Sequence, residues 1–141
     1  MIVLDTNVIS ETMRRTPDAA VIDWLDHQPR SELYLCAPVL AELCYGIARL
    51  EESQRKLGLL RAYRQIITES FEGRVLPFDA HAAELYGDLV AKLESDGRAI
   101  DVIDAMIAAI AQSNAATLAT RNTAHFADTG LALVDPFGAS R

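Results

Sequence analysis

Short apolar runs alternate with longer amphipathic stretches along this chain, and this pattern indicates strands alternating with helices. The runs that we expect to form strands are residues 2–4, 33–36, 75–78, 117–119 and 131–134. Most are apolar throughout, which is typical of strands buried on both faces of a parallel sheet. The alternation therefore predicts an α/β fold, with a central parallel sheet flanked by helices.

Amphipathic stretches predict the helices of this fold. Pro17 and Asp18 open the first one, whose apolar stripe contains Ala20, Val21, Trp24 and Leu25. Pro38 suits the first turn of a second helix, which runs to about Arg49. Three more are expected at about 52–70, after an N-cap at Asp79, and at about 102–113. No linker or internal repeat separates these elements, so we expect a single domain over residues 1–141.

Composition argues against a membrane protein. No apolar stretch reaches the roughly 18 to 20 residues that a membrane span needs, and Asp5 interrupts the first apolar run too early for a signal peptide. Cys36 and Cys44 are the only cysteines, and they show no metal-binding or redox spacing. We expect both to be reduced core residues of a cytoplasmic protein.

The net charge of −7 is unfavourable for binding nucleic acid, because basic surfaces bind phosphates. A local basic patch can still do so. One segment concentrates positive charge, and its members are Arg49, Arg55, Lys56, Arg61 and Arg64. Two interpretations remain open for this segment: a solvated helix face or an arm that contacts phosphates.

Three acidic residues stand out because their surroundings are apolar. Asp5 directly follows the strand expected at residues 2–4, Glu42 lies within the apolar stretch 37–43, and Asp104 lies within 102–110. Charged carboxylates rarely occupy such positions unless they are paired or bound to a metal. The carboxyl edge of a parallel sheet is where open α/β folds place their chemistry, and these three acids can converge there.

Each acid also has a purely structural interpretation. Asp5 can cap a following turn, and Glu42 and Asp104 can complement the dipoles of their helices. Asp101 is best explained in this second way, because it precedes the apolar stripe instead of lying within it. The three structural explanations together are less economical than one shared site.

Clustered carboxylates repel one another unless a counter-ion is present. Mg²⁺ and Mn²⁺ favour oxygen ligands, whereas zinc would favour histidine or cysteine, and His27, His81 and His125 show no ligand spacing. Carboxylate-bound metals activate water and polarise phosphoryl oxygens. The three acids therefore indicate hydrolysis of phosphodiester bonds.

Four motifs in order resemble those of the PIN-domain ribonucleases, and in particular the VapC-like toxins of bacterial toxin–antitoxin pairs. These motifs are residues 2–10, residues 38–43 with Gly46, residues 104–109 and residues 119–126. The resemblance extends over nearly the whole chain and includes the tail at residues 133–137. It implies a PIN fold and endonucleolytic cleavage of RNA that depends on Mg²⁺ or Mn²⁺.

The resemblance also implies roles for individual residues. Asp5, Glu42 and Asp104 take the positions that hold metal and activate water, and Asn122 takes a fourth catalytic position that is often aspartate. An amide cannot serve as a base, so this departure favours one firmly held ion. The polar neighbours that orient the acids are Thr6, Asn7 and Thr120. His125 is either a proton donor or a structural residue.

The partners implied by the resemblance are an RNA substrate, a second copy of the chain and a small VapB-like antitoxin. In such pairs an antitoxin segment lies across the helical arm of the toxin and places a basic side chain in the acidic pocket. Residues 38–71 fit such an arm, although their apolar side chains also suit an ordinary core. A basic partner segment would complement the negative net charge.

Two rival functions begin from the same residues. Phosphoryl-accepting domains also place aspartate after the first strand, but the phosphatase pattern needs a second aspartate where this chain has Asn7. Both phosphoryl-accepting classes need a late lysine, and none follows Lys92. The other rival is a catalytically weak PIN-like module that binds RNA or protein, and only Asn122 favours it.

Overall fold

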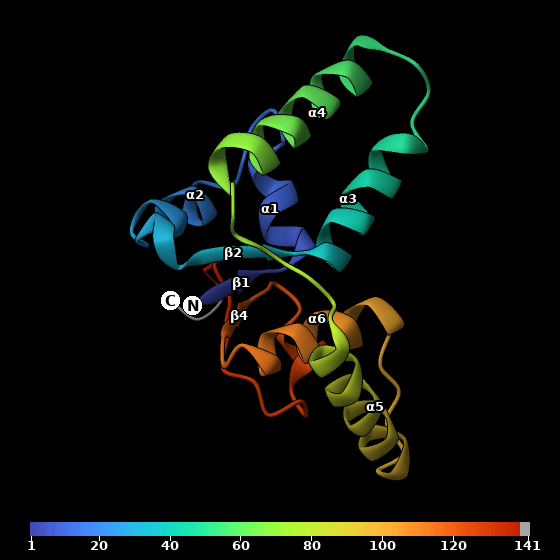
Figure 1. Cartoon of the computed structure of the whole chain (residues 1–141). Coiled ribbons are helices and arrows are strands. Elements are labelled where there is room, and N and C mark those ends of the chain that lie inside the picture. Colours follow the sequence, from blue (N-terminus) through green and yellow to red (C-terminus); the bar gives the residue numbers. More distant parts are fainter. Residues whose placement is uncertain (139–141) are drawn as a thin grey trace.

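A parallel sheet forms the centre of the molecule in the computed structural model, which describes residues 1–138 (Figure 1). Its strands are β1 (Ile2–Leu4), β2 (Leu33–Cys36), β3 (Val75–Leu76), β4 (Thr117–Ala119) and β5 (Leu133–Val134). They follow the order β3-β2-β1-β4-β5, and every neighbouring pair is parallel. The expected α/β fold is confirmed.

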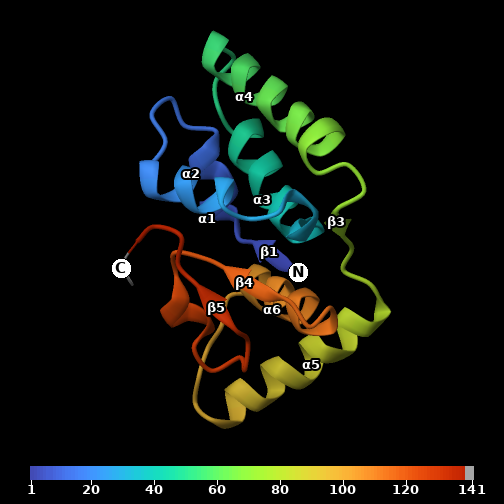
Figure 2. The ribbon, with the colours of Figure 1, turned by 90° about the vertical axis from the view of Figure 1, so that its left-hand side faces the viewer.

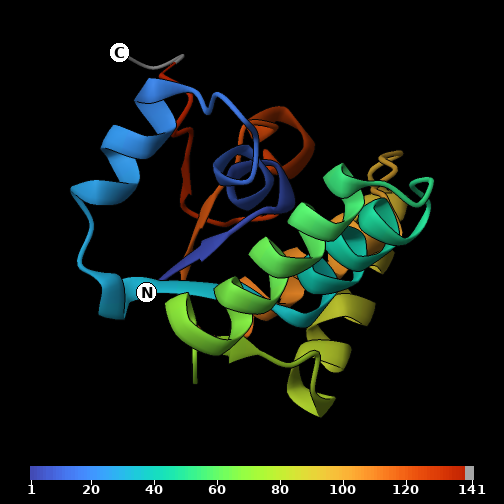
Figure 3. The ribbon, with the colours of Figure 1, turned by 90° about the horizontal axis from the view of Figure 1, so that it is seen from above.

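The helices are α1 (Thr6–Thr12), α2 (Ala19–Asp26), α3 (Ala37–Ala48), α4 (Gln54–Gln65), α5 (Ala80–Ser95) and α6 (Val102–Ser113). Shorter turns are the 3-10 segments η1 (Arg30–Glu32) and η3 (Thr123–Phe126) and the π-helical segment η2 (Ile66–Ser70). Helices α3 and α4 lie beside each other as an arm, whereas α5 and α6 pack together at the other end of the molecule (Figures 1, 2 and 3). Within residues 1–138, no helix combines the length and the apolarity needed to cross a membrane.

Several sequence predictions differ from the structure in detail. Helix α1 was not expected, because only seven residues separate Asp5 from Met13 and their apolar spacing is too short to identify. Strands β3 and β5 are each two residues long, so they cover only parts of the expected runs 75–78 and 131–134. The helix expected at 52–70 begins at Gln54 and widens into η2 for its last turn.

The register of the central strands aligns their carboxyl ends. Leu4 of β1 pairs with Ala119 of β4, and Ala119 pairs in turn with Val134 of β5. The sheet core consists of side chains with no exposed surface, including Val3, Leu4, Leu35 and Leu118, against which Ile107 and Ile110 of α6 pack. Burial of apolar area on this scale stabilises each such side chain by about 1.5–3 kcal/mol. The residues just after β1 and β4 are therefore held rigidly at one edge.

Cys44 does not lie in the core, contrary to the sequence prediction. Cys36 is buried at the end of β2, but Cys44 is exposed on α3. An apolar neighbourhood in the sequence does not specify which side of a helix faces solvent, and α3 buries a stripe containing Val39, Leu43 and Ile47. Burial raises the pKa of the Cys36 thiol to about 12.

Candidate active site

Asp5 lies at the carboxyl end of β1 and has two structural roles there. Its backbone N–H donates to the carbonyl of Ala119 at 2.9 Å, so the ladder between β1 and β4 extends one residue beyond the strands. Its Oδ1 accepts the backbone N–H of Thr6 at 2.7 Å and caps α1. The capping interpretation is therefore correct, but it accounts for only one of the carboxylate oxygens.

A polar network holds the other carboxylate oxygen of Asp5. Asp5 is only 4% exposed. The Thr120 hydroxyl donates to Oδ2 at 2.7 Å, and the Asn7 amide donates to the same oxygen at 3.3 Å. Asn7 is fixed in turn, because its Oδ1 accepts the backbone N–H of Arg121 at 3.1 Å. A carboxylate has about four acceptor positions, so Asp5 keeps capacity for a further ligand.

Glu42 lies in the second turn of α3 and connects to the same network through Thr6. The Thr6 hydroxyl donates to Oε1 of Glu42 at 2.5 Å. The backbone N–H of Thr6 also donates to Asp5, so Thr6 is hydrogen-bonded to both acids. Thr6, Asn7 and Thr120 thus each donate a side-chain hydrogen bond to Asp5 or Glu42, and their supporting role in catalysis stays a prediction.

Asp104 lies in the first turn of α6, where Asp101 caps the helix by accepting the N–H of Ile103 at 3.1 Å. This cap confirms the structural interpretation of Asp101. Burial raises the pKa of Asp104 from 3.8 to about 6, and the negative charges of Asp5 and Glu42 act in the same direction. The side chain of Asp104 therefore feels both of the other acids.

His125 is a neighbour of Asp104 that can carry positive charge. The ring of His125 in η3 places Nδ1 3.7 Å from Oδ2 of Asp104, and its side chain is 61% exposed. A protonated His125 would partly offset the charge of Asp104. His125 thus lies within reach of the acidic site, although it is turned largely towards solvent.

The donor chemistry of the site fits a hard divalent cation. Asp5, Glu42 and Asp104 supply only carboxylate oxygens, which Mg²⁺ and Mn²⁺ prefer. Within residues 1–138, no three His, Cys, Asp or Glu side chains form a preassembled ligand group. Burial is the main cause of the raised pKa of Asp104, and the negative charges of Asp5, Asp101 and Glu42 raise it further.

Asn122 lies beside the site but is exposed. Its backbone N–H donates to the Thr120 hydroxyl at 3.0 Å, and that hydroxyl donates to Asp5. The residue then precedes η3, which carries His125. Asn122 is thus tied to Asp5 through Thr120 by its backbone.

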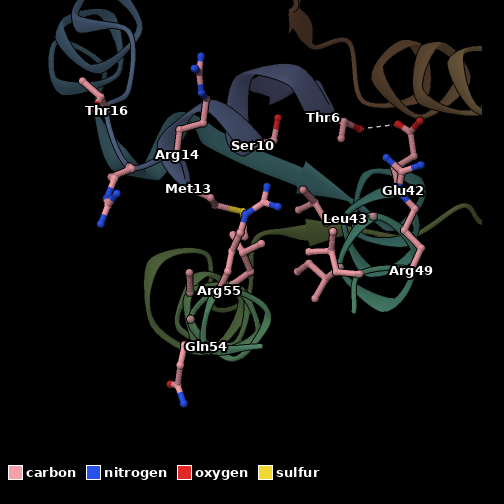
Figure 4. A pocket seen from close by; sticks show the side chains of 17 residues that line it. Thr6, Ser10, Met13, Arg14, Thr16, Glu42, Leu43, Arg49, Gln54 and Arg55 are labelled. Carbon is pink, nitrogen blue, oxygen red and sulfur yellow. Dashed lines mark hydrogen bonds between the residues drawn. The ribbon is translucent and has the colours of Figure 1, made fainter. Parts of the chain in front are cut away.

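A pocket of about 1080 Å³ opens beside Glu42 (Figure 4). Thr6 and Glu42 line one part of it, and its other lining residues come from α1, the following loop, α3 and α4. The apolar lining includes Leu43, Ile47, Leu50 and Leu59. The arginines that line it are Arg14, Arg15, Arg49 and Arg55.

The basic segment of the sequence divides between two environments. Arg49 and Arg55 line the pocket, whereas Arg61 and Arg64 are exposed on α4. Lys56 is used structurally, because its ammonium group donates to the carbonyls of Ala48 and Leu50 near the end of α3. The exposure of Arg61 and Arg64 fits a solvated helix face, and the arm that contacts phosphates stays a prediction.

Sequence reasoning missed Glu11 and the arginines that follow it. Glu11 is 5% exposed, and its Oε2 accepts the backbone N–H of Asp18 at 2.8 Å. It also pairs with Arg14 at 3.2 Å, so it fixes the loop that supplies Arg14 and Arg15 to the pocket. The signal in the sequence was an acid three residues before an arginine, and such pairs are common on exposed surfaces.

The chain matches the family described as the PIN domain over residues 2–131. It belongs to the PIN-domain family. The plasmid stability protein StbB of Pseudomonas syringae is 43% identical over 99% of this chain and 100% of its own length. The VapC ribonuclease Y4jK of Sinorhizobium fredii is 40% identical, with 97% and 98% of the two chains covered. The toxin FitB of Neisseria gonorrhoeae is 39% identical, with 97% and 99% covered.

Solved structures agree with these relatives. The chain is similar to one in the FitAB complex bound to an IR36 DNA fragment, with a TM-score of 0.92, 37% identity and 100% and 99% of the two chains covered. It is also similar to one in DNA-bound VapBC2 of Rickettsia felis, with a TM-score of 0.76, 27% identity and 96% and 98% covered. The predicted resemblance to PIN-domain proteins is confirmed, and so is the predicted resemblance to proteins named VapC.

Proposed function

We propose that this protein is the toxin of a VapC-like toxin–antitoxin pair and that it hydrolyses RNA phosphodiester bonds endonucleolytically with Mg²⁺ or Mn²⁺. The observation that carries this proposal is the polar network at the carboxyl end of β1, in which Thr120 and Asn7 donate to Asp5 and Thr6 donates to Glu42. The relatives named as a ribonuclease and as a toxin support the same activity.

Asp5, Glu42 and Asp104 would hold the metal ion, and the network around them sets their positions. Thr120 and Asn7 fix Asp5, while Thr6 fixes Glu42. A bound Mg²⁺ or Mn²⁺ would lower the pKa of an attacking water and stabilise charge on the phosphoryl oxygens. Asn122 can orient a water or a substrate oxygen but cannot accept its proton as a base. Nδ1 of His125 lies 3.7 Å from Oδ2 of Asp104, and in this proposal His125 would donate a proton to the leaving oxygen.

The antitoxin is the proposed protein partner, and the pocket beside Glu42 is its proposed docking site. Solved relatives of this chain are toxin–antitoxin complexes. The pocket offers apolar side chains to an amphipathic segment, and a basic residue of that segment would fit beside Glu42. We also propose that the toxin forms a homodimer, and that it acts in the cytoplasm, where RNA and the antitoxin are made.

Cleavage of defined RNAs by the purified protein tests the enzymatic proposal. We expect cleavage with Mn²⁺ or Mg²⁺, none in a chelator, and recovery when metal is restored. Asp5→Asn should abolish cleavage while leaving the circular dichroism spectrum unchanged. Asp88→Asn is the matched control, because it removes an exposed acid of α5 that does not line the pocket beside Glu42.

A catalytically weak binding module is the alternative function, and Asn122 favours it because the fourth acidic position lacks a carboxylate. RNA binding without cleavage at any metal concentration would establish that alternative. Cleavage that survives both chelation and Asp5→Asn would instead remove the proposed metal-dependent mechanism.

A further inference from the structure

One side of α3 carries an aromatic and a basic residue next to the acidic site. Glu42, Tyr45 and Arg49 follow one another at spacings of three and four residues, which places them along the same side of the helix. Tyr45 lies ~4.5 Å further along the helix axis than Glu42. The acidic site therefore continues directly into this aromatic and basic pair.

Tyr45 is unusual because its ring is left in solvent. The residue is 68% exposed, the largest exposed fraction among the large hydrophobic residues of the described chain. The guanidinium carbon of Arg49 lies 5.9 Å from the ring centroid, which is a cation–π distance. Most of the ring surface remains accessible with Arg49 beside it.

Arg49 connects Tyr45 to the pocket at the acidic site. It lines the same pocket as Thr6 and Glu42, and it directly follows the last residue of α3, the helix that carries Glu42 (Figure 4). An arginine in this position can contact a phosphate while the neighbouring ring remains free. Together the two residues offer what one nucleotide of a single strand needs: an aromatic face for the base and a cation for the phosphate.

We propose that Tyr45 is the stacking platform for an unpaired RNA base adjacent to the scissile phosphate, and that Arg49 contacts the backbone of the same strand. This inference rests on the proposed ribonuclease function and specifies its substrate: an unstacked, single-stranded segment. Bases within a duplex are stacked on their neighbours and cannot reach the ring. Tyr45 is thus a positioning residue for the substrate.

Three substitutions at Tyr45 separate stacking from simple apolar contact. Tyr45→Phe keeps the aromatic face, Tyr45→Leu keeps an apolar side chain without that face, and Tyr45→Ala removes both. On a short unpaired RNA that the parent cleaves, we expect Tyr45→Phe to match the parent. We expect Tyr45→Leu and Tyr45→Ala to raise KM about tenfold with little change in kcat. Leu57→Ala is the control, because it truncates an exposed apolar residue of α4 that does not line the pocket.

Abasic nucleotides identify the stacked base. In the parent, one abasic position beside the cut should raise KM about tenfold, and in Tyr45→Ala the same abasic RNA should cause no further loss. Additive losses, or an unchanged KM for Tyr45→Leu, would overturn the proposal. Equal cleavage of the same sequence within a perfect duplex would also overturn it.

The main alternative to an RNA base as the binding partner of the exposed Tyr45 ring is a second copy of this chain. Light scattering at the assay concentration measures this directly. A Tyr45→Ala variant with altered mass and additive abasic losses would assign the ring to a protein interface and overturn the RNA proposal. Non-additive effects of Tyr45→Ala and the abasic nucleotide on KM would support stacking, whether or not the variant has an altered mass. A parent that cleaves no RNA would instead refute the proposed function, which is a different result from cleavage that is insensitive to Tyr45.

Discussion

The hydroxyl of Thr120 donates to Oδ2 of Asp5 at 2.7 Å, although 115 positions separate the two residues. The contact exists because β1 and β4 are adjacent parallel strands whose carboxyl ends coincide. The same hydroxyl accepts the backbone N–H of Asn122 at 3.0 Å, so it links the first acid to the loop that carries His125. Thr120 has no exposed surface, and its hydroxyl therefore has little access to water.

We expect Thr120→Val to lower both stability and RNA cleavage. Valine has nearly the same shape but no hydroxyl, so Asp5 loses a donor and Asn122 loses an acceptor. Leaving buried polar groups unpaired costs about 1–3 kcal/mol, which urea unfolding should measure. Thr120→Ser retains the hydroxyl and should keep cleavage close to that of the parent. Equal stability of the parent and the valine variant would show that this contact is dispensable.

The stability of the metal-free protein should depend on pH through Asp104. Because its folded-state pKa lies at about 6 instead of 3.8, folding favours the protonated form, and this stabilisation is lost as pH rises from about 4 through 6. Asp104→Asn cannot undergo this loss. Its melting temperature should therefore match that of the parent near pH 4 and exceed it at pH 7.

Added Mn²⁺ provides the complementary measurement at pH 7. It should raise the melting temperature of the parent, because an ion present at a hundred times its Kd stabilises by about 2.7 kcal/mol. Asp104→Asn should gain much less. If the metal-free parent melted higher than metal-free Asp104→Asn at pH 7, that result would contradict the raised pKa of Asp104.

Glu11 is predicted to stabilise the loop that supplies arginines to the pocket. Glu11→Ala removes the acceptor of the Asp18 N–H and the partner of Arg14, and we expect a loss of about 1–3 kcal/mol in the free energy of unfolding. Glu52→Ala is the control, because Glu52 is 85% exposed in its pair with Lys56 and should cost no more than about 1 kcal/mol. Similar losses for the two variants would show that burial of Glu11 has no energetic consequence.

The two cysteines should differ in reactivity. Cys44 is exposed, whereas Cys36 is buried with its thiol pKa raised to about 12. A maleimide should therefore add once to the native protein at pH 7 and twice in denaturant, as read by mass spectrometry. Peptide mapping should place the native adduct on Cys44. Rapid double modification of the native protein would place Cys36 nearer to solvent than the structure does.

The sequence by itself determined the order of the five strands, the order of every helix except α1, and the candidate acids. Apolar runs such as residues 33–36 have few alternatives to burial in a sheet, and an acid such as Asp104 inside an apolar helix is conspicuous for the same reason. Local pattern specifies burial because burial of apolar side chains dominates the folding free energy.

Only the tertiary structure decided which distant side chains meet and which surfaces remain open. The contact of Thr6 with Glu42, the burial of Glu11 and the exposure of Cys44 and Tyr45 depend on how α1, α3 and α4 pack, and helical periodicity leaves that choice open. Hydrogen bonds and charge repulsion act over a few ångströms, so their partners become defined once the sheet has brought the strand ends together.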